Sequence, residues 1–360
     1  MSIVELPKYE RVKLAIIGDI EQGRLVPGSL IPSEAELLER FDVSRPTLVR
    51  SFQDLVREGW VYRRQGKGTF VADRTARPVE PTAPEGQIVP LFVHSQAVRQ
   101  SGDAKELLIH LMRGVQTALE GAGFSLVMRS IKDMSRQEID KFLGARSPGP
   151  ALVVEPSSTP LLWEELRNRG WNAWAILDNV PDGNCVFIDQ EHAGYLAARY
   201  LLSRGCRNVA LLNGPLTAYW GFQARLAGYQ RALAEFDLPY RTELALEGAH
   251  VVDSEAGRAM LRSLVDAGIS FDGVIGASDG KAIGAMMSAE EAGLKLGHDV
   301  QFVSIDNTVA QYAPHPLSSV TMAFEEAGRL AASLAISPLF NMGPSPIQTH
   351  SKLVPTLVER

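Results

Sequence analysis

The proline-rich segment at residues 74–87 constrains the fold of this 360-residue chain more than any other feature. It contains three prolines, one glycine and almost no side chain that a core could bury. Such a composition favours an extended linker of polyproline II character. The chain is also more than twice as long as a typical domain of about 150 residues. The sequence therefore predicts a small domain at residues 1–73, a linker at 74–87 and a larger domain at 88–360.

Charge is distributed unevenly along the chain. Residues 40–77 contain nine Lys and Arg against four Asp and Glu, whereas residues 78–360 contain 23 against 31. A basic segment attached to an acidic body is typical of a protein in which one end binds nucleic acid.

The apolar spacing before the linker predicts three helices and a hairpin. The helices are expected at residues 9–21, from residue 33 and at residues 44–58, and Ser33 with Glu36 forms a capping box at the start of the second. The apolar stripe of the third helix leaves Arg50 pointing outward. Two short strands, at residues 60–64 and 69–72, flank a glycine-rich turn. This order of elements is typical of a winged helix-turn-helix.

Three motifs in this region resemble the N-terminal DNA-binding domain of GntR-type regulators. They are PSEAEL at residues 32–37, VSRPTL at 43–48 and QGKGTFV at 65–71. The resemblance implies operator DNA as a partner and a set of contact residues: Lys8, Ser33, Glu34, Ser44, Arg45, Thr47, Arg50, Gln65, Gly66 and Lys67.

Side-chain chemistry at the start of the third helix agrees with that expectation. Hydroxyl and guanidinium groups can contact phosphates and base edges, and arginine has the bidentate geometry for guanine. Lys67, at the hairpin tip, can enter the adjacent minor groove. The chain departs from the family where an arginine is usual, because Val49 stands there and Arg50 follows. The departure leaves two alternatives open, base contact by Arg50 or none.

After the linker, short apolar strands alternate with amphipathic helices. Strands are expected at residues 88–93, 124–128, 151–154, 174–177, 185–188, 209–212, 273–276 and 301–305. Repeated strand–helix units specify an α/β fold with doubly wound parallel sheets covered on both faces. About 270 residues are too many for one such sheet, so we expect two lobes with a cleft between them.

Four segments of this half resemble the effector domain of LacI-type repressors, a periplasmic-binding-protein-like fold of type I. They are FIDQEHAGYLAARYLLSRGCRNVALL, ARLAGYQRAL, FDGVIGASDGKAIGAM and FVSIDNTVAQYAPHPLSSVTM. A GntR-type reader joined to such a sensor resembles the arabinose-repressor group of bacterial regulators. The resemblance implies a sugar effector, L-arabinose or a related pentose being favoured, although the LacI-type family also includes purine sensors.

Candidate effector-binding residues follow the predicted strands, because small molecules bind beyond the carboxyl ends of parallel strands. Asp178, Ser278, Asp279 and Asp306 lie at such ends. The resemblance adds Arg225 as the group that grips the effector and matches Asp306 to a sugar-contacting aspartate. Flat side chains for the C–H face of a sugar are Trp220, His250 and Phe324.

Each candidate has a structural alternative. Asp279 can serve as a helix N-cap, and Arg225 can pair with a carboxylate of its own lobe. Trp220 and Phe324 can belong to the core.

One motif favours a different class of protein. Residues 276–280 satisfy G-x-S-x-G between a strand and a helix, so a serine hydrolase using Ser278 is the alternative to a regulator. The seven histidines lack the spacing of metal ligands, and we expect neither a metal nor a cofactor. The chain has no apolar run of about 20 residues and no basic start followed by an apolar run, which predicts a cytoplasmic protein that does not associate with a membrane.

A homodimer is expected, because two readers double the contact with an operator of two half-sites. The candidate interface is the predicted helix at residues 105–119, whose apolar side chains exceed one buried stripe. They are Leu107, Leu108, Leu111, Met112 and Val115.

Overall fold

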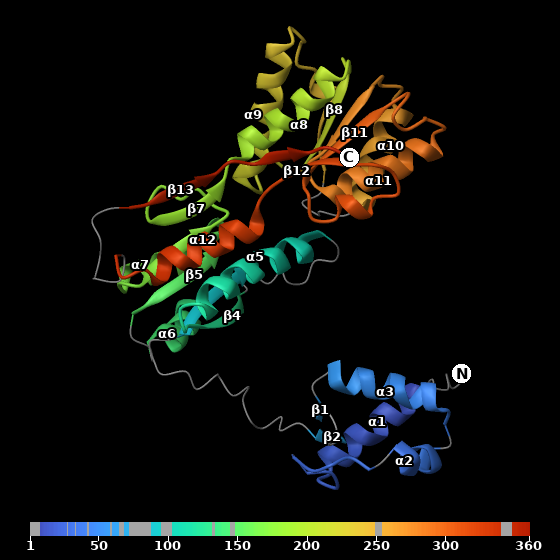
Figure 1. Ribbon diagram of the computed structural model, residues 1–360, viewed down its shortest axis with the longest axis vertical. Coiled ribbons are helices and arrows are strands. Elements are labelled where there is room, and N and C mark those ends of the chain that lie inside the picture. Colours follow the sequence, from blue (N-terminus) through green and yellow to red (C-terminus); the bar gives the residue numbers. More distant parts are fainter. Residues whose placement is uncertain are drawn as a thin grey trace. The chain divides into compact units, whose positions relative to one another are not determined.

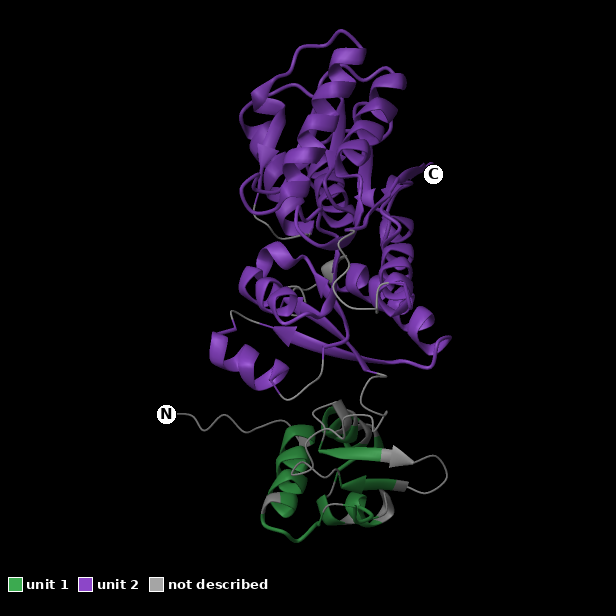
Figure 2. Cartoon of the chain, turned by 90° about the vertical axis from the view of Figure 1, so that its left-hand side faces the viewer, with its two compact units in different colours: residues 1–82 green, residues 83–360 purple. Residues whose placement is uncertain are grey.

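The computed structural model divides the chain into two compact units, Met1–Thr82 and Ala83–Arg360 (Figure 2). It describes residues 8–26, 28–32, 34–41, 43–57, 60–64, 68–71, 88–94, 103–131, 134–144, 148–248, 254–339 and 348–360. The predicted linker at 74–87 lies outside these residues.

The described residues of the first unit form three helices followed by a two-stranded hairpin. These elements are α1 (Lys8–Glu21), α2 (Glu34–Phe41), α3 (Arg45–Arg57), β1 (Val61–Arg64) and β2 (Gly68–Val71). The strands are antiparallel, with Val61 opposite Val71 and Arg64 opposite Gly68. Their order confirms the winged helix-turn-helix.

Apolar side chains of all three helices and both strands form one small core. It consists of Val12, Ile16, Ile31, Leu37, Leu48, Phe52, Leu55, Val61 and Val71. At its edge the buried carboxylate of Asp19 accepts hydrogen bonds from Arg24 and from Arg40 Nη2 at 2.7 Å, and these bonds lower the pKa of Asp19 despite its burial. The ion pairs tie the first two helices together.

The described residues of the second unit form two parallel-dominated sheets of six strands each (Figure 1). The sheet of lobe 1 has the order β13-β7-β6-β5-β3-β4, and all its pairings are parallel. Its strands are β3 (Ile88–His94), β4 (Ser125–Ile131), β5 (Pro150–Val154), β6 (Asn172–Ile176), β7 (Asn184–Ile188) and β13 (His350–Leu353).

The sheet of lobe 2 has the order β14-β12-β11-β10-β8-β9, in which β14 alone is antiparallel to its neighbour. Its strands are β8 (Val209–Asn213), β9 (Ala245–Glu247), β10 (Gly273–Gly276), β11 (Gln301–Asp306), β12 (Ser318–Thr321) and β14 (Thr356–Val358). The two sheets confirm the doubly wound, two-lobed α/β fold.

Helices cover both faces of each sheet. In lobe 1 these are α5 (Asp103–Glu120), α12 (Phe324–Ile336), α6 (Arg136–Leu143) and α7 (Pro160–Asn168); in lobe 2 they are α8 (Gln190–Ser203), α9 (Trp220–Glu235), α10 (Ser254–Asp266) and α11 (Asp279–Glu291). Alternation along β3 explains the two layers, because Leu91 and Val93 join the cluster under α5 and α12 while Phe92 joins the cluster under α6 and α7.

Three of these helix pairs cross through reciprocal glycines. A Cβ on Gly194 of α8 would lie 2.1 Å from the carbonyl oxygen of Arg225 on α9, and a Cβ on Gly228 of α9 would lie 1.9 Å from that of Glu191 on α8. The same exchange occurs between α5 and α12 and between α10 and α11. The backbone of Arg225 is therefore positioned by direct contact with α8.

The chain passes between the lobes three times. It leaves β7 for α8 at Asp189, returns from β12 to α12 through Met322 and Ala323, and leaves β13 for β14 at residues 354–355. Ala323 has a positive φ of 48° at the second crossing. Because three short connections join two separate sheets, rotation about them can change how the lobes are oriented.

Two expectations about this unit need correction. Strands β9, β12, β13 and β14 were not among the predicted strands. In α5 the side chains of Leu108, Leu111 and Val115 are buried in the core of lobe 1, because the sheet and α12 cover them. Leu107 and Met112 are partly buried against the same core, whereas Ile109 is exposed.

Candidate functional site

The start of α3 presents polar side chains to solvent. Ser44 and Arg45 are exposed, and the Ser44 Oγ lies 2.8 Å from the half-buried Thr47 Oγ1. Arg50 is also exposed, with its Cζ 3.9 Å from the centre of the Tyr9 ring. That stacking orients the guanidinium of Arg50 on the outer side of the helix.

Several of the predicted site residues are not described by the structure, or are described only by their place in a helix. Ser33, Gln65, Gly66, Lys67 and His250 lie outside the described residues. Lys8 and Glu34 are the first residues of α1 and α2.

The second unit brings together Arg225, which the family resemblance supplied, and Asp306, which the carboxyl-end argument supplied. Their Nη2 and Oδ1 atoms are 3.7 Å apart, and both side chains are more than nine-tenths buried. The Arg225 Nε donates to Gln190 Oε1 at 2.8 Å, and its Nη1 donates to the carbonyl of Ala277. Arg225 is therefore held by three acceptors in lobe 2.

Asp178 follows β6 in lobe 1 and contacts lobe 2 through its side chain. Its Oδ2 accepts a hydrogen bond from the Ser157 backbone N–H, and its Oδ1 accepts one from Trp220 Nε1, both at 2.8 Å. Beside it the Tyr219 hydroxyl donates to the Leu177 carbonyl at 3.2 Å. The start of α9 thus contacts the end of β6 directly, so Asp178, Trp220, Arg225 and Asp306 belong to one site between the lobes.

Glu155 belongs to the same site, although it was not among the predicted residues. It follows β5 as Asp178 follows β6, with its backbone N–H bonded to the Ile176 carbonyl. Burial and the neighbouring Asp178 carboxylate raise the pKa of Glu155 to about 7, against the opposing charge of Arg225. The rule that located Asp178 would have located Glu155 as well.

Asn213, the last residue of β8, was missed in the same way. Its Nδ2 donates to the Phe222 carbonyl at 2.9 Å, while within the described part of the chain its buried Oδ1 has no hydrogen-bond partner. The fully buried Lys281 donates from Nζ to the Asn213 carbonyl at 3.4 Å and lies 5.6 Å from the Phe222 ring centre. A buried acceptor without a hydrogen-bond partner lowers the free energy of unfolding. Asn213 is therefore a candidate ligand-binding residue.

Backbone strain gathers at the same edge of the sheets. Positive φ values occur at Glu155 (47°), Leu177 (70°) and Asp306 (111°), each where a strand ends. Such conformations cost about 1 to 3 kcal/mol each and are characteristic of ligand-binding positions.

Asp279 and Ser278 have structural roles. The Asp279 Oδ1 accepts hydrogen bonds from the hydroxyls of Ser304 and Ser319, and its Oδ2 accepts backbone N–H bonds from residues 308, 309 and 310. Ser278 is the N-cap of α11 and accepts from the Lys281 N–H. Together they fix the loop that follows Asp306.

The predicted aromatic residues divide between site and core. Trp220 is half-buried and packs edge-on against Phe187, with ring centres 6.3 Å apart. Phe324 is buried in the main core at the start of α12, which agrees with its structural alternative.

The hydrolase alternative is wrong on geometry. Ser278 has an extended backbone, φ −147° and ψ 162°, instead of the strained turn of a nucleophile elbow, and it is fully buried. The downstream histidines are elsewhere: His315 Nε2 lies 2.8 Å from Glu290 Oε1 at the surface, and His350 begins β13 in lobe 1.

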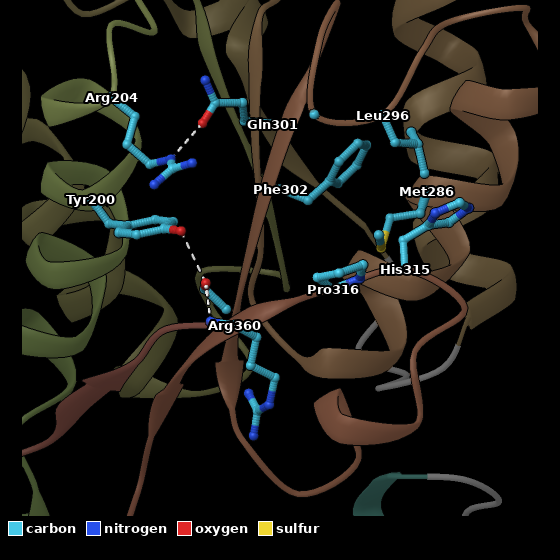
Figure 3. A pocket seen from close by; sticks show the side chains of 11 residues that line it. Tyr200, Arg204, Met286, Leu296, Gln301, Phe302, His315, Pro316 and Arg360 are labelled. Carbon is cyan, nitrogen blue, oxygen red and sulfur yellow. Dashed lines mark hydrogen bonds between the residues drawn. The ribbon is translucent and has the colours of Figure 1, made fainter.

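Lobe 2 also contains a separate cavity of about 290 Å³ (Figure 3). It adjoins Gln301 and Ser318, where β11 and β12 begin, whereas Asp306 lies where β11 ends. Its two guanidinium groups are bonded to the protein, Arg204 to Gln301 Oε1 and Arg360 to Asn307 Oδ1. The cavity is distinct from the inter-lobe site.

The described residues contain no group of three or more His, Cys, Asp or Glu side chains able to hold a metal ion. None of the helices described is long and apolar enough to cross a membrane.

Two family models match the chain. The model described as "Bacterial regulatory proteins, gntR family" matches residues 8–71, and the model described as "Periplasmic binding protein-like domain" matches residues 198–360. The matches support the assignment of each unit.

Curated relatives extend these matches over most of the chain. It is 26% identical over 356 residues to the arabinose metabolism transcriptional repressor of Geobacillus stearothermophilus, covering 92% of this chain and 91% of the relative. It is 30% identical to the HTH-type transcriptional repressor PurR of Proteus mirabilis, covering 80% and 89%.

A solved structure of similar fold is the transcriptional regulator CelR-cellobiose complex. The TM-score is 0.64 at 23% identity, covering 88% of this chain and 90% of that chain. The likeness supports the two-lobed fold.

Proposed function

This chain belongs to the HTH-type transcriptional repressors, joining a gntR-type DNA-binding domain to a periplasmic-binding-protein-like effector domain, and we propose that a small sugar bound between its lobes releases it from operator DNA. It is a ligand-responsive regulator and not an enzyme.

The observation that carries the proposal is the buried inter-lobe site. Arg225 and Asp306 from lobe 2 meet Asp178 from lobe 1, and Trp220 bridges the two. Carboxylates and hydroxyls at such a boundary can accept the several hydroxyl protons of a sugar. A ligand that replaces inter-lobe contacts must favour one orientation of the lobes over another.

The size of the response is limited by differential affinity. A ligand that binds one orientation 100-fold more tightly supplies about 2.7 kcal/mol of coupling between sugar and DNA. Because three connections join the lobes, their reorientation is the motion that we propose to be transmitted.

L-Arabinose or a related pentose is our proposed effector. Its support is the name of the relative that matches over most of both chains, together with the polar lining of the site. The 30% identity to a PurR repressor makes purines the comparison class in any ligand screen.

The DNA contacts and the assembly are also proposals. We place base reading at Arg45, with Ser44, Thr47, Arg50 and the wing residue Lys67 as further contacts. A cytoplasmic homodimer on two half-sites agrees with helix-turn-helix recognition. The exposed Ile109 of α5 replaces the buried leucines as the apolar candidate for the dimer face.

Two substitutions test the proposal. Arg225→Ala and Asp306→Ala should still bind operator but lose at least 100-fold in sugar sensitivity, because each leaves a buried charge without its partner. Arg231→Ala is the matched control, since Arg231 is exposed on the same helix and pairs with Glu191. Operator release is measured by fluorescence anisotropy during sugar titration. Normal release by either site variant would contradict the proposal.

A further inference from the structure

A chain of three hydrogen bonds leads from Arg225 in lobe 2 to the backbone of lobe 1. The Arg225 Nε donates to Gln190 Oε1 at 2.8 Å, and Gln190 Nε2 donates to the Tyr219 hydroxyl oxygen at 3.2 Å. The Tyr219 hydroxyl donates in turn to the carbonyl of Leu177, the residue after β6, also at 3.2 Å. Gln190 therefore connects the guanidinium that we propose to bind the effector with a contact between the lobes.

The direction of these bonds follows from the chemistry of the groups. A guanidinium has donors and no acceptor, so the part of the Gln190 amide that faces Arg225 must be its oxygen. The amide NH2 then faces Tyr219, whose oxygen accepts and whose single proton is left for the Leu177 carbonyl. The bond between the lobes thus depends, through Gln190, on where Arg225 directs its Nε–H.

Packing restricts the two side chains in the middle of this chain of bonds. Gln190 is only 3% exposed. A Cβ on Gly221 would lie 2.2 Å from the Tyr219 ring, and Phe222 packs edge-on against that ring with centres 5.4 Å apart. Because the Tyr219 ring has little room to move, a change at Arg225 has to be met by a turn of the Gln190 amide or by loss of a bond.

Gln190 also lies where the chain enters lobe 2. It is the first residue of α8 and follows Asp189 directly. The Asp189 backbone N–H donates to the Leu353 carbonyl at 2.9 Å, and its Oδ2 accepts from Lys352 Nζ at 2.8 Å. The first and third passages between the lobes are therefore joined beside Gln190, and a displacement of this residue acts on both.

We propose that Gln190 is a positioning residue that makes ligand binding at Arg225 compete with the contact between the lobes. A ligand oxygen that accepts the Arg225 Nε–H takes it from Gln190 Oε1. The Gln190 amide is then free to turn, and the Tyr219 hydroxyl donates to the amide oxygen instead of the Leu177 carbonyl. The inference rests on the proposed function, because it specifies how the same site passes the occupancy of Arg225 to the lobes.

Competition of this kind determines the sign of a measurable effect. Binding has to break the Tyr219–Leu177 bond in protein that contains it, so this bond lowers the apparent affinity for the ligand. If the bond is removed beforehand, the affinity for sugar rises. Loss of a group that contacts the ligand, or that only supports the fold of the site, lowers the affinity instead. The direction of the change therefore identifies the competition.

Two substitutions should change sugar affinity in opposite directions. Tyr219→Phe removes the bond to Leu177, so sugar should bind at least threefold more tightly, as expected for one neutral hydrogen bond. Gln190→Glu sets a carboxylate against Arg225, and because a charge-assisted bond is stronger than a neutral one, sugar should bind at least threefold more weakly. Full-length protein is titrated calorimetrically with L-arabinose, D-xylose, D-ribose and D-galactose. The comparison uses the sugar that best releases the wild-type protein from operator DNA.

The chain offers a matched control for each substitution. Tyr229→Phe removes a buried tyrosine hydroxyl that donates to the Val209 carbonyl at 2.8 Å, a bond inside lobe 2. Gln223→Glu makes the same chemical change at an exposed position of α9, where Gln223 Nε2 donates to the Leu216 carbonyl at 2.9 Å. Neither residue belongs to the chain of bonds, so each control should keep the sugar affinity within twofold of wild type.

Each outcome decides something. Tighter binding by Tyr219→Phe together with weaker binding by Gln190→Glu supports the inference. Unchanged or weaker binding by Tyr219→Phe overturns it. Tighter binding by Tyr219→Phe without weaker binding by Gln190→Glu overturns the role of Gln190. Failure of every sugar to release the wild-type protein, with operator binding intact, overturns the sugar effector of the proposed function and this inference with it.

Discussion

The two lobes hold their buried carboxylates in different ways. In lobe 2, Asp279 accepts hydrogen bonds from six protein groups, and Asp306 pairs with Arg225. In lobe 1, Asp178 has two donors, and burial together with the charge of Asp178 raises the pKa of Glu155. In lobe 2 the protein itself supplies partners for both carboxylates. In lobe 1 the ionised form of Glu155 is disfavoured.

This difference suggests separate tasks for the two faces. A carboxylate surrounded by protein donors costs little to keep ionised and holds its loop in place. A carboxylate near a like charge costs more to keep ionised, so its protonation responds to pH near neutrality. We therefore expect substitution of Asp279 in lobe 2 to affect mainly the stability of the fold, and substitution of Glu155 in lobe 1 to affect mainly its pH dependence.

The largest effect is expected from Asp279→Ala. It leaves the buried hydroxyls of Ser304 and Ser319 and three backbone N–H groups without an acceptor, so the free energy of unfolding should fall by roughly 3 to 5 kcal/mol. Urea unfolding measures it. The exposed Asp266→Ala should change stability by less than about 0.5 kcal/mol, and equal losses in the two variants would remove the distinction.

A smaller, pH-dependent effect is expected from Glu155→Gln. The pKa of Glu155 is about 7 in the folded chain, above its ordinary 4.5, so the folded state keeps a proton that the unfolded state loses between these values. The stability contributed by this group is complete below about pH 4.5 and is lost as pH rises through 7. The variant should match the wild type at pH 5 and exceed it at pH 8 by at most about 3 kcal/mol. Parallel pH profiles of the two proteins would contradict this.

The smallest effect is expected from Trp220→Phe, which keeps the ring beside Phe187 but removes the hydrogen bond to Asp178. Loss of one bond to a charged group should lower the free energy of unfolding by about 1 to 2 kcal/mol. Tyr219→Phe removes the neutral bond to Leu177 and should cost less. If Tyr219→Phe costs more than Trp220→Phe in urea unfolding, Asp178 is not the stronger link between the lobes.

Much of the fold follows from local pattern. The helices of the first unit and the inner strands of the second were predictable, because each buries an apolar stripe or run. Strand β13 was not, since its residues His350, Ser351 and Lys352 show no such run and pair with β7 only through tertiary structure. The prediction that the apolar side chains of α5 form a dimer interface was wrong for a related reason. Its leucines pack in the core that α12 covers, and α12 lies about 200 residues further along the chain.

The site was partly predictable by the same logic. The carboxyl-end rule identified Asp178 and Asp306, and it would have identified Glu155 and Asn213 if applied to every strand. It could not distinguish Asp279, whose carboxylate is used by the loop at residues 308–310, because that loop reaches it only in the folded state.

The three passages between the lobes also determine the order in which the chain can assemble on the ribosome. Residues 190–321 supply all of lobe 2 except the edge strand β14, so that sheet can form from one continuous piece of nascent chain. Lobe 1 lacks its covering helix α12 until the inner strands of lobe 2 have been made, so Leu111 and Val115 of α5 remain uncovered until then. The lobe whose first strand is made first therefore gains its covering helix only after most of the other lobe, and the apolar face of α5 is exposed in the growing chain until that point.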